Sequence, residues 1–149
     1  MRWLTAVVAA LLLTACVVTP GEQGRFVALP ADGWAYGDTV AFDSLCPDSV
    51  ATGRLAVSVR HTNAYLYSNL WLELTTPQGD SVRRDTINVP LADDFGRWYG
   101  RGVGVSFATI DTLPGSYTLL RQRPVYVRHI MRCDTLGDIE QIGLVFINE

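Results

Sequence analysis

The stretch Leu55-Ala56-Val57-Ser58-Val59-Arg60 alternates between large apolar side chains and small or polar ones. A period of two residues is that of a β-strand with one buried face, whereas no segment beyond the N-terminal run keeps a helical apolar period over three turns. Strands are therefore expected to dominate the fold. The same alternation recurs in residues 38–42, 66–74, 87–89, 103–107, 117–119, 125–131 and 142–146.

Turn-forming sequences separate these alternating segments. Pro77-Gln78-Gly79-Asp80, Asp93-Asp94-Phe95-Gly96 and Leu113-Pro114-Gly115 combine the residues that tight turns favour. About eight short strands with such punctuation predict an all-β fold, a single-domain antiparallel β-sandwich with a jelly-roll or immunoglobulin-like layout. Residues 133–140 are expected to form either a helical turn or a loop.

The N-terminus has the features of a bacterial lipoprotein signal. Arg2 precedes an apolar run over residues 3–13, which is too short to span a bilayer and is typical of a cleaved signal peptide. The tetrapeptide Leu13-Thr14-Ala15-Cys16 resembles a lipobox, so we expect cleavage before Cys16 and lipidation of its sulfur. The alternative is an ordinary signal peptide cut after Ala15. The expected organisation is a signal peptide at 1–15, a lipidated tether at 16–25 and a sandwich domain at 26–149.

The charged residues exclude several classes of protein. All 12 basic residues are arginine, against 15 acidic residues, and the net charge is −3. P-loops, Schiff-base enzymes and protein kinases need a lysine, so these classes are excluded. The arginines form no cluster longer than Arg83-Arg84, which argues against a nucleic-acid partner.

Catalytic motifs are also missing from the sequence. Of the two histidines, His129 alternates with strand residues and is expected in the core, while His61 follows a strand and is expected in an exposed turn. The adjacent pair Asp93-Asp94 is better explained by a turn than by a glycosidase or calcium site. We therefore expect no enzymatic activity, no cofactor and no metal site.

Two further cysteines, Cys46 and Cys133, remain in the expected mature chain. An isolated pair in an oxidising compartment is more often bonded than free, which predicts one disulfide. The alternative is two separate thiols.

Aromatic residues gather on what alternation makes the polar face of one strand. Tyr65, Tyr67, Asn69 and Trp71 lie opposite a row of leucines, and Trp98 follows them in sequence. Together with Arg132 they predict an interaction surface that docks a protein or stacks on a sugar. The alternative is a second, partly buried face that a loop of the same chain covers.

Four segments together resemble the gliding-motility lipoprotein H (GldH) family of Bacteroidetes. Residues 60–72 (RHTNAYLYSNLWL) are similar to its strand signature R-N-x-x-x-Y-x-x-x-N-L-(W/F)-L, and residues 91–102 (LADDFGRWYGRG) to L-A-x-x-x-G-x-W-x-G-x-G. Residues 114–117 (PGSY) resemble P-x-G-x-Y, and residues 131–144 (MRCDTLGDIEQIGL) resemble the ending M-R-x-x-x-L-x-G-I-x-x-V-G-(F/L). The order and spacing match over nearly the whole expected mature chain.

The sequence departs from this family pattern at a few positions. His61 stands where asparagine is usual, Asp138 interrupts the Gly-Ile pair, and Cys46 and Cys133 are outside the pattern. These departures leave the expected fold unchanged.

The resemblance implies a non-enzymatic function. It implies a lipid-anchored accessory protein of the gliding machinery and the linked type IX secretion system, which contacts the membrane through its acyl chains and binds other envelope proteins. Surface-exported lipoproteins of these bacteria usually carry acidic residues just after the cysteine. Val17-Val18-Thr19-Pro20 has none, so we expect an outer-membrane lipoprotein on the periplasmic face. The alternative function is a glycan-binding module.

Overall fold

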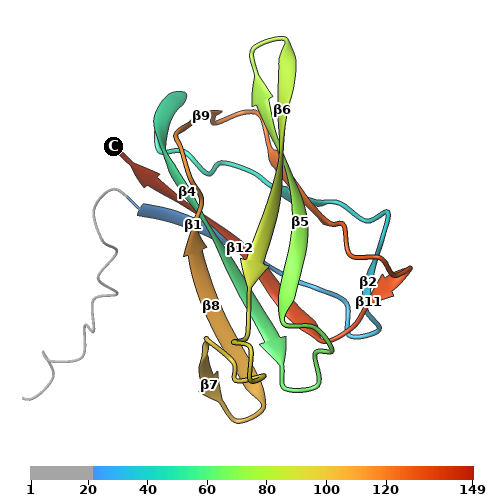
Figure 1. Ribbon diagram of the computed structural model, residues 1–149. Helices are drawn as coiled ribbons and strands as arrows, with labels where there is room; N and C mark the ends of the chain where they lie inside the picture. Colours follow the sequence, from blue (N-terminus) through green and yellow to red (C-terminus); the bar gives the residue numbers. More distant parts are fainter. Residues whose placement is uncertain (1–21) are drawn as a thin grey trace, which may run out of the picture.

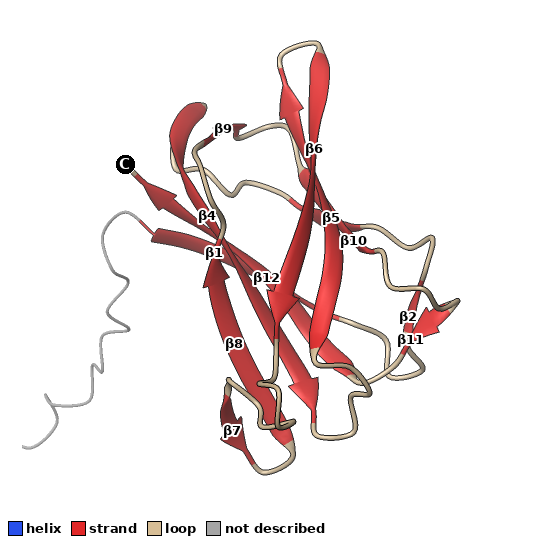
Figure 2. Cartoon of the chain, viewed as in Figure 1, coloured by secondary structure: helices blue, strands red, loops and turns tan. Residues whose placement is uncertain are grey.

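The computed structural model describes residues 22–149, which form twelve strands. The expected signal peptide, Cys16 and the first part of the tether lie outside the described residues. Figure 2 shows strands and connecting loops throughout the described range. Within that range there is no helix with the length and apolar character that a membrane span requires.

The larger sheet has six strands arranged around one long strand, β4 (Val50–Thr62). One side of β4 pairs with β12 (Ile139–Asn148), which in turn pairs with the edge strand β1 (Glu22–Ala28). The other side pairs first with β9 (Tyr117–Leu120) and then with β8 (Ser106–Thr112). β7 (Arg101–Val103) pairs with β8 at the far edge.

The smaller sheet has four strands in the order β3 (Val40–Phe42), β10 (Val125–His129), β5 (Asn69–Gln78) and β6 (Ser81–Pro90). A separate two-stranded ribbon joins β2 (Trp34–Ala35) to β11 (Thr135–Leu136). Figure 1 shows the two sheets facing each other, with this ribbon to one side.

The strand order identifies the layout. Eight main strands count toward it; numbered one to eight in chain order, they are β1, β3, β4, β5, β6, β8, β10 and β12. The larger sheet contains the first, eighth, third and sixth of these, which are β1, β12, β4 and β8. The smaller sheet contains the second, seventh, fourth and fifth. All the pairings are antiparallel, and this is the order of a jelly roll. The predicted all-β sandwich is confirmed, in its jelly-roll form.

The core lies between the two sheets and contains the alternating residues of the sequence. Leu55, Val57 and Val59 of β4 are fully buried against the leucines of β5. β12 and β10 fill the rest of the space with branched and aromatic side chains. The fully buried members from these two strands are Ile142, Leu144, Phe146, Val125 and Val127.

The structure differs from the expected segments in three places. Residues 22–25, expected in the tether, pair with β12 as part of β1; at a sheet edge, backbone pairing needs no apolar alternation. Residues 133–140, expected as a helical turn or a loop, hold no helical turn: β11 and the start of β12 are joined there by a short loop. The strand expected over 103–107 is interrupted by a turn at Gly104, whose φ is +63°, so Val103 and Val105 are exposed.

Candidate functional site

Tyr65 is the predicted surface residue that the structure moves into the core. The strand expected from residue 66 begins only at Asn69, because residues 63–68 form the turn and loop after β4. Because these residues are in a loop, their side chains do not follow the alternation expected of a strand. Tyr65 is 5% exposed and Leu66 is 84% exposed. The prediction that Tyr65 faces a partner was therefore wrong.

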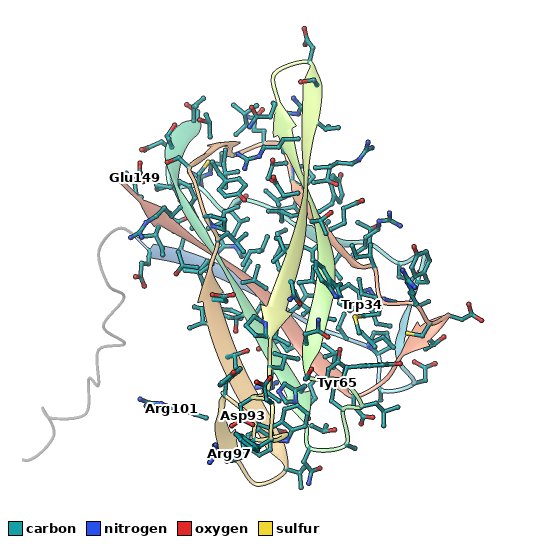
Figure 3. All side chains as sticks on the ribbon, in the orientation of Figure 1. Trp34, Tyr65, Asp93, Arg97, Arg101 and Glu149 are labelled. Atoms are coloured by element: carbon teal, nitrogen blue, oxygen red, sulfur yellow. The ribbon has the colours of Figure 1, made fainter. Side chains whose placement is uncertain are left out.

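The buried Tyr65 instead fixes the loop that leads into β5. Its hydroxyl donates a hydrogen bond to the carbonyl oxygen of Asn69 at 2.9 Å, and its ring packs edge-on against that of Tyr67. Burial raises the pKa of the Tyr65 hydroxyl well above its usual value, so this hydroxyl keeps its proton as a donor. Tyr65, labelled in Figure 3, thus positions Tyr67 and Asn69, which are both partly exposed.

Four of the predicted surface residues meet in one depression. This aromatic hollow has a volume of about 520 Å³ and lies at the start of β5 and the end of β10. The rings of Tyr67 and Trp71 are 39% and 40% exposed, so each has a free face and a supported one. Its lining consists of Tyr67, Asn69, Trp71, Ile130, Met131 and Arg132.

The sequence did not indicate Ile130 and Met131, which the pairing of distant strands brings to Trp71. The backbone N–H of Ile130 donates to the carbonyl of Trp71 at 2.9 Å, and the Trp71 N–H points to the Met131 sulfur at 3.2 Å. The amide of Asn69 donates to Asn88 of β6 at 2.8 Å. These contacts hold the walls of the aromatic hollow, while the guanidinium of Arg132 forms no ion pair with any residue in 22–149.

Trp98 does not join the aromatic hollow. It lies in the loop between β6 and β7, where its ring is 4.5 Å from that of His61 and 6.0 Å from that of Phe107. These contacts cover the end of β4 in the larger sheet. His61, expected in an exposed turn, is consequently buried, because the loops after β4 and β6 fold over it.

The other residues considered for chemistry have structural roles. His129 is buried as predicted, and its Nε2 donates to the Trp34 carbonyl at 2.9 Å. Burial lowers the pKa of His129, which keeps its ring neutral.

Asp93 forms the predicted turn. Its carboxylate accepts backbone hydrogen bonds from Phe95 and Arg97 at 2.9 Å each, and the bond from Arg97 is the main cause that lowers the pKa of Asp93. Across residues 22–149, no three His, Cys, Asp or Glu side chains gather to hold a metal ion.

The predicted disulfide is not formed in this structure, where Cys46 and Cys133 are both free. Cys46 follows β3 and points to the carbonyl oxygens of Asp48 and Leu119, whereas Cys133 follows β10. β3 and β10 are antiparallel neighbours, so the two cysteines lie beyond opposite ends of this strand pair. The physical reason for the difference is thus the topology, which separates the two thiols.

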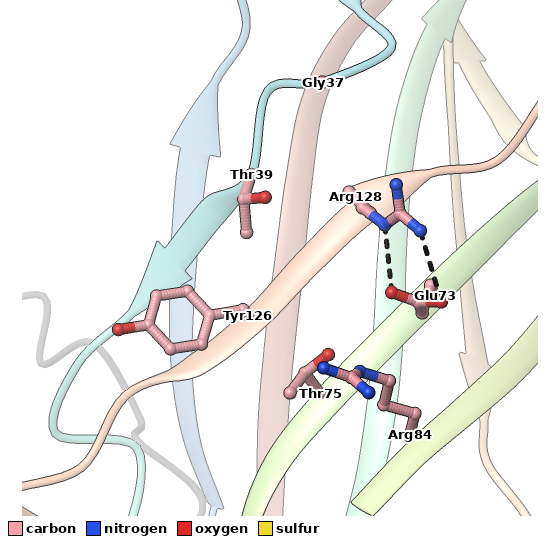
Figure 4. A pocket seen from close by; sticks show the side chains of 7 residues that line it. All are labelled: Gly37, Thr39, Glu73, Thr75, Arg84, Tyr126 and Arg128. Carbon is pink, nitrogen blue, oxygen red and sulfur yellow. Dashed lines mark hydrogen bonds and ion pairs between the residues drawn. The ribbon is translucent and has the colours of Figure 1, made fainter. Parts of the chain in front are cut away.

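A second depression, the polar hollow, lies on the same outer face of the smaller sheet. Its volume is about 510 Å³, and Figure 4 shows side chains of β5, β6, β10 and the loop before β3 around it. Arg128 forms a two-pronged ion pair with Glu73, at 2.9 and 3.4 Å, and this hydrogen bonding lowers the pKa of the Glu73 carboxyl. The lining consists of Gly37, Thr39, Glu73, Thr75, Arg84, Tyr126 and Arg128.

The GldH lipoprotein family model matches residues 24–146, which is most of the chain and runs from within β1 to within β12. The chain belongs to the GldH lipoprotein family. This confirms the resemblance that the four sequence segments indicated. A curated relative, the "Gliding motility lipoprotein GldH homolog" of Christiangramia forsetii, is 36% identical over 73 residues. That match covers 48% of this chain and 44% of the relative, so the chain aligns with less than half of the relative's length.

Among solved structures, the CBM35 from Cellvibrio japonicus Abf62 is similar with a TM-score of 0.40 and 13% sequence identity. The likeness covers 85% of this chain and 98% of that one. At this TM-score the likeness says nothing of a shared ligand.

Proposed function

We propose that this GldH-family lipoprotein is a non-enzymatic accessory component of the gliding machinery and of the linked type IX secretion system. Acyl chains on Cys16, palmitate among them, hold it in the outer membrane on the periplasmic face, where it docks other envelope proteins. The family match and the lipobox support the anchored, motility-related part. The docking part rests on the aromatic hollow.

The observation that carries the docking proposal is the convergence of two half-exposed aromatic rings with an arginine in one depression. Trp, Tyr and Arg are the residues that most often dominate the binding energy of protein interfaces. Met131 adds a polarisable thioether that adapts to the shape of a partner. The lining of the hollow therefore has the composition of a recognition surface.

The experiment places a photocrosslinking amino acid at position 67, at the rim of the aromatic hollow, in the native host. We expect mass spectrometry to identify subunits of the gliding or secretion machinery among the crosslinked proteins. Trp71→Ser should abolish these crosslinks, whereas the matched variant Tyr99→Ser should keep them. Tyr99 is 61% exposed but lies in the loop before β7, on the other sheet.

Two outcomes contradict the proposal. Crosslinks that survive Trp71→Ser but disappear in Tyr99→Ser would move docking to the loops of the larger sheet. The second is glycan binding: exposed aromatic rings beside an amide and a guanidinium also suit stacking on sugars. Micromolar to millimolar binding to envelope glycans, lost in Trp71→Ser and without protein crosslinks, would favour the glycan-binding module.

A further inference from the structure

We propose that the polar hollow binds an acidic, extended segment of the protein that docks in the aromatic hollow. This inference rests on the proposed docking function and names the chemistry of the partner. Arg84 is the residue expected to bind a carboxylate of that segment.

The strand register places Arg84 at the β6 end of a polar row across three strands. Tyr126 of β10 is opposite Thr75 of β5, and Thr75 is opposite Arg84 of β6. Figure 4 shows the guanidinium of Arg84 beside Thr75, inside the hollow. The hydroxyls of Thr75 and Tyr126 therefore offer hydrogen-bond donors on the side chains next to the cation.

Arg84 differs from Arg128 in forming no ion pair within the described residues, although it lies near enough to Glu73 for its charge to help lower the pKa of that carboxyl. Glu73 binds Arg128 through both carboxylate oxygens, so this pair is already satisfied. Arg84 forms no ion pair with any side chain in the described range of 22–149. A guanidinium is a bidentate donor for which a carboxylate is the matching acceptor.

The charged side chains of the two hollows support the same inference. The hollows are lined by Arg84, Arg128 and Arg132, with Glu73 as their one carboxylate. Their linings are therefore net positive on a chain whose net charge is −3. Charge complementarity of this kind selects an acidic partner and steers its approach.

The distance between the hollows indicates an extended peptide. Trp71, Glu73 and Thr75 alternate along one face of β5, and Thr75 marks the position of Arg84. Four residues of strand span about 13 Å, which is also the span of four residues of an extended peptide. A segment laid along β5 would place an aromatic or aliphatic residue on Trp71 and an Asp or Glu on Arg84.

The test uses the purified full-length lipoprotein in detergent and fluorescein-labelled peptides, read by fluorescence anisotropy. The acidic peptide has one phenylalanine followed four residues later by two glutamates, within a Ser/Gly background, and the control peptide has glutamines in their place. We expect the acidic peptide to bind about tenfold more tightly than the glutamine peptide, with affinity falling as salt is added.

Arg84→Gln should remove most of this preference, while Arg54→Gln should keep it. Arg54 is also an exposed strand arginine, but it lies on β4 in the larger sheet. Unchanged thermal unfolding of both variants would show that neither effect comes from misfolding.

Three results would overturn the inference: equal binding of the two peptides, an unchanged preference in Arg84→Gln, or binding of polygalacturonate, an acidic polysaccharide, in place of the peptide. Failure of the proposed function is distinguishable, because it would appear as the loss of protein crosslinks from position 67. If those crosslinks persist and Arg84→Gln has no effect on the peptides, only the acidic-segment inference is wrong.

Discussion

Replacing Tyr65 by phenylalanine removes one hydrogen bond and leaves the packing of the ring in place. The Tyr65 hydroxyl donates to the Asn69 carbonyl at 2.9 Å, and the side chain is 5% exposed. Loss of such a bond costs about 1 kcal/mol in the free energy of unfolding. For a domain of this size that corresponds to a decrease in Tm of about 3–5 °C.

Replacing Tyr65 by alanine removes the ring as well. The ring packs against those of His61 and Tyr67, with centroids 5.7 and 5.6 Å away. Truncation of a buried aromatic residue costs about 3–5 kcal/mol, a large share of the stability of a small domain. Both variants should also weaken docking, because the loop that carries Tyr67 is no longer tied to Asn69 at the start of β5.

Urea denaturation of the three proteins measures these differences, and the slope with denaturant should stay the same. Tyr99→Phe is the matched control: its side chain is 61% exposed, and its hydroxyl makes no hydrogen bond with any residue in 22–149. It should unfold as the wild type does. If Tyr65→Ala cost under about 1 kcal/mol, the buried role of Tyr65 would be refuted.

Three further predictions concern the anchor, the thiols and pH. Cys16→Ser should release the protein from membranes, and fatty-acid labelling that persists in this variant would contradict lipidation there. Cys46 and Cys133 should both be alkylated after denaturation without reductant; in the native protein burial raises both thiol pKa values and slows the reaction, which mass spectrometry measures. Because burial lowers the pKa of His129 below 6.5, the unfolded chain binds its proton first as the pH falls. Tm should therefore decrease as the pH falls from 7.5 to 5.5, and it should decrease less in His129→Gln. An equal decrease in the two proteins would refute His129 as its cause.

Local sequence patterns predicted those parts of the fold that local chemistry determines. The alternation at Leu55, Val57 and Val59 predicted the core face of β4, because strand geometry alone sends these side chains to one side. The turn at Asp93 was also predictable, since its carboxylate accepts hydrogen bonds from residues two and four positions further on. His129 was expected in the core on the same grounds of alternation.

Features that depend on contacts between distant segments were not predictable in this way. Alternation cannot show where a loop resets the period, so Tyr65 and Leu66 were assigned to the wrong faces. His61 is covered by Trp98, more than thirty residues later in the chain. Tyr67, Asn69, Trp71 and Arg132, which line the aromatic hollow, were named from the sequence as part of an interaction surface. Met131 reaches the hollow only through the pairing of β5 with β10.

The positions of the anchor and of the aromatic hollow suit a docking protein. Glu22 is opposite Ile147 in the larger sheet, so β1 begins at the end where the chain also finishes (Figure 1). Arg54 of β4 pairs with Ile147 and so lies at the same end as Glu22. From Arg54 to the other end of β4 at Thr62 the strand spans about 26 Å, and Trp71 lies near the start of β5, which follows that other end. Cys16 is six positions before Glu22 in the sequence, a length of chain that can reach at most about 20 Å. If Cys16 carries the proposed lipid, β1 begins at one end of the sandwich and the aromatic hollow opens on the other sheet near the opposite end, so the proposed partner would not compete with the bilayer.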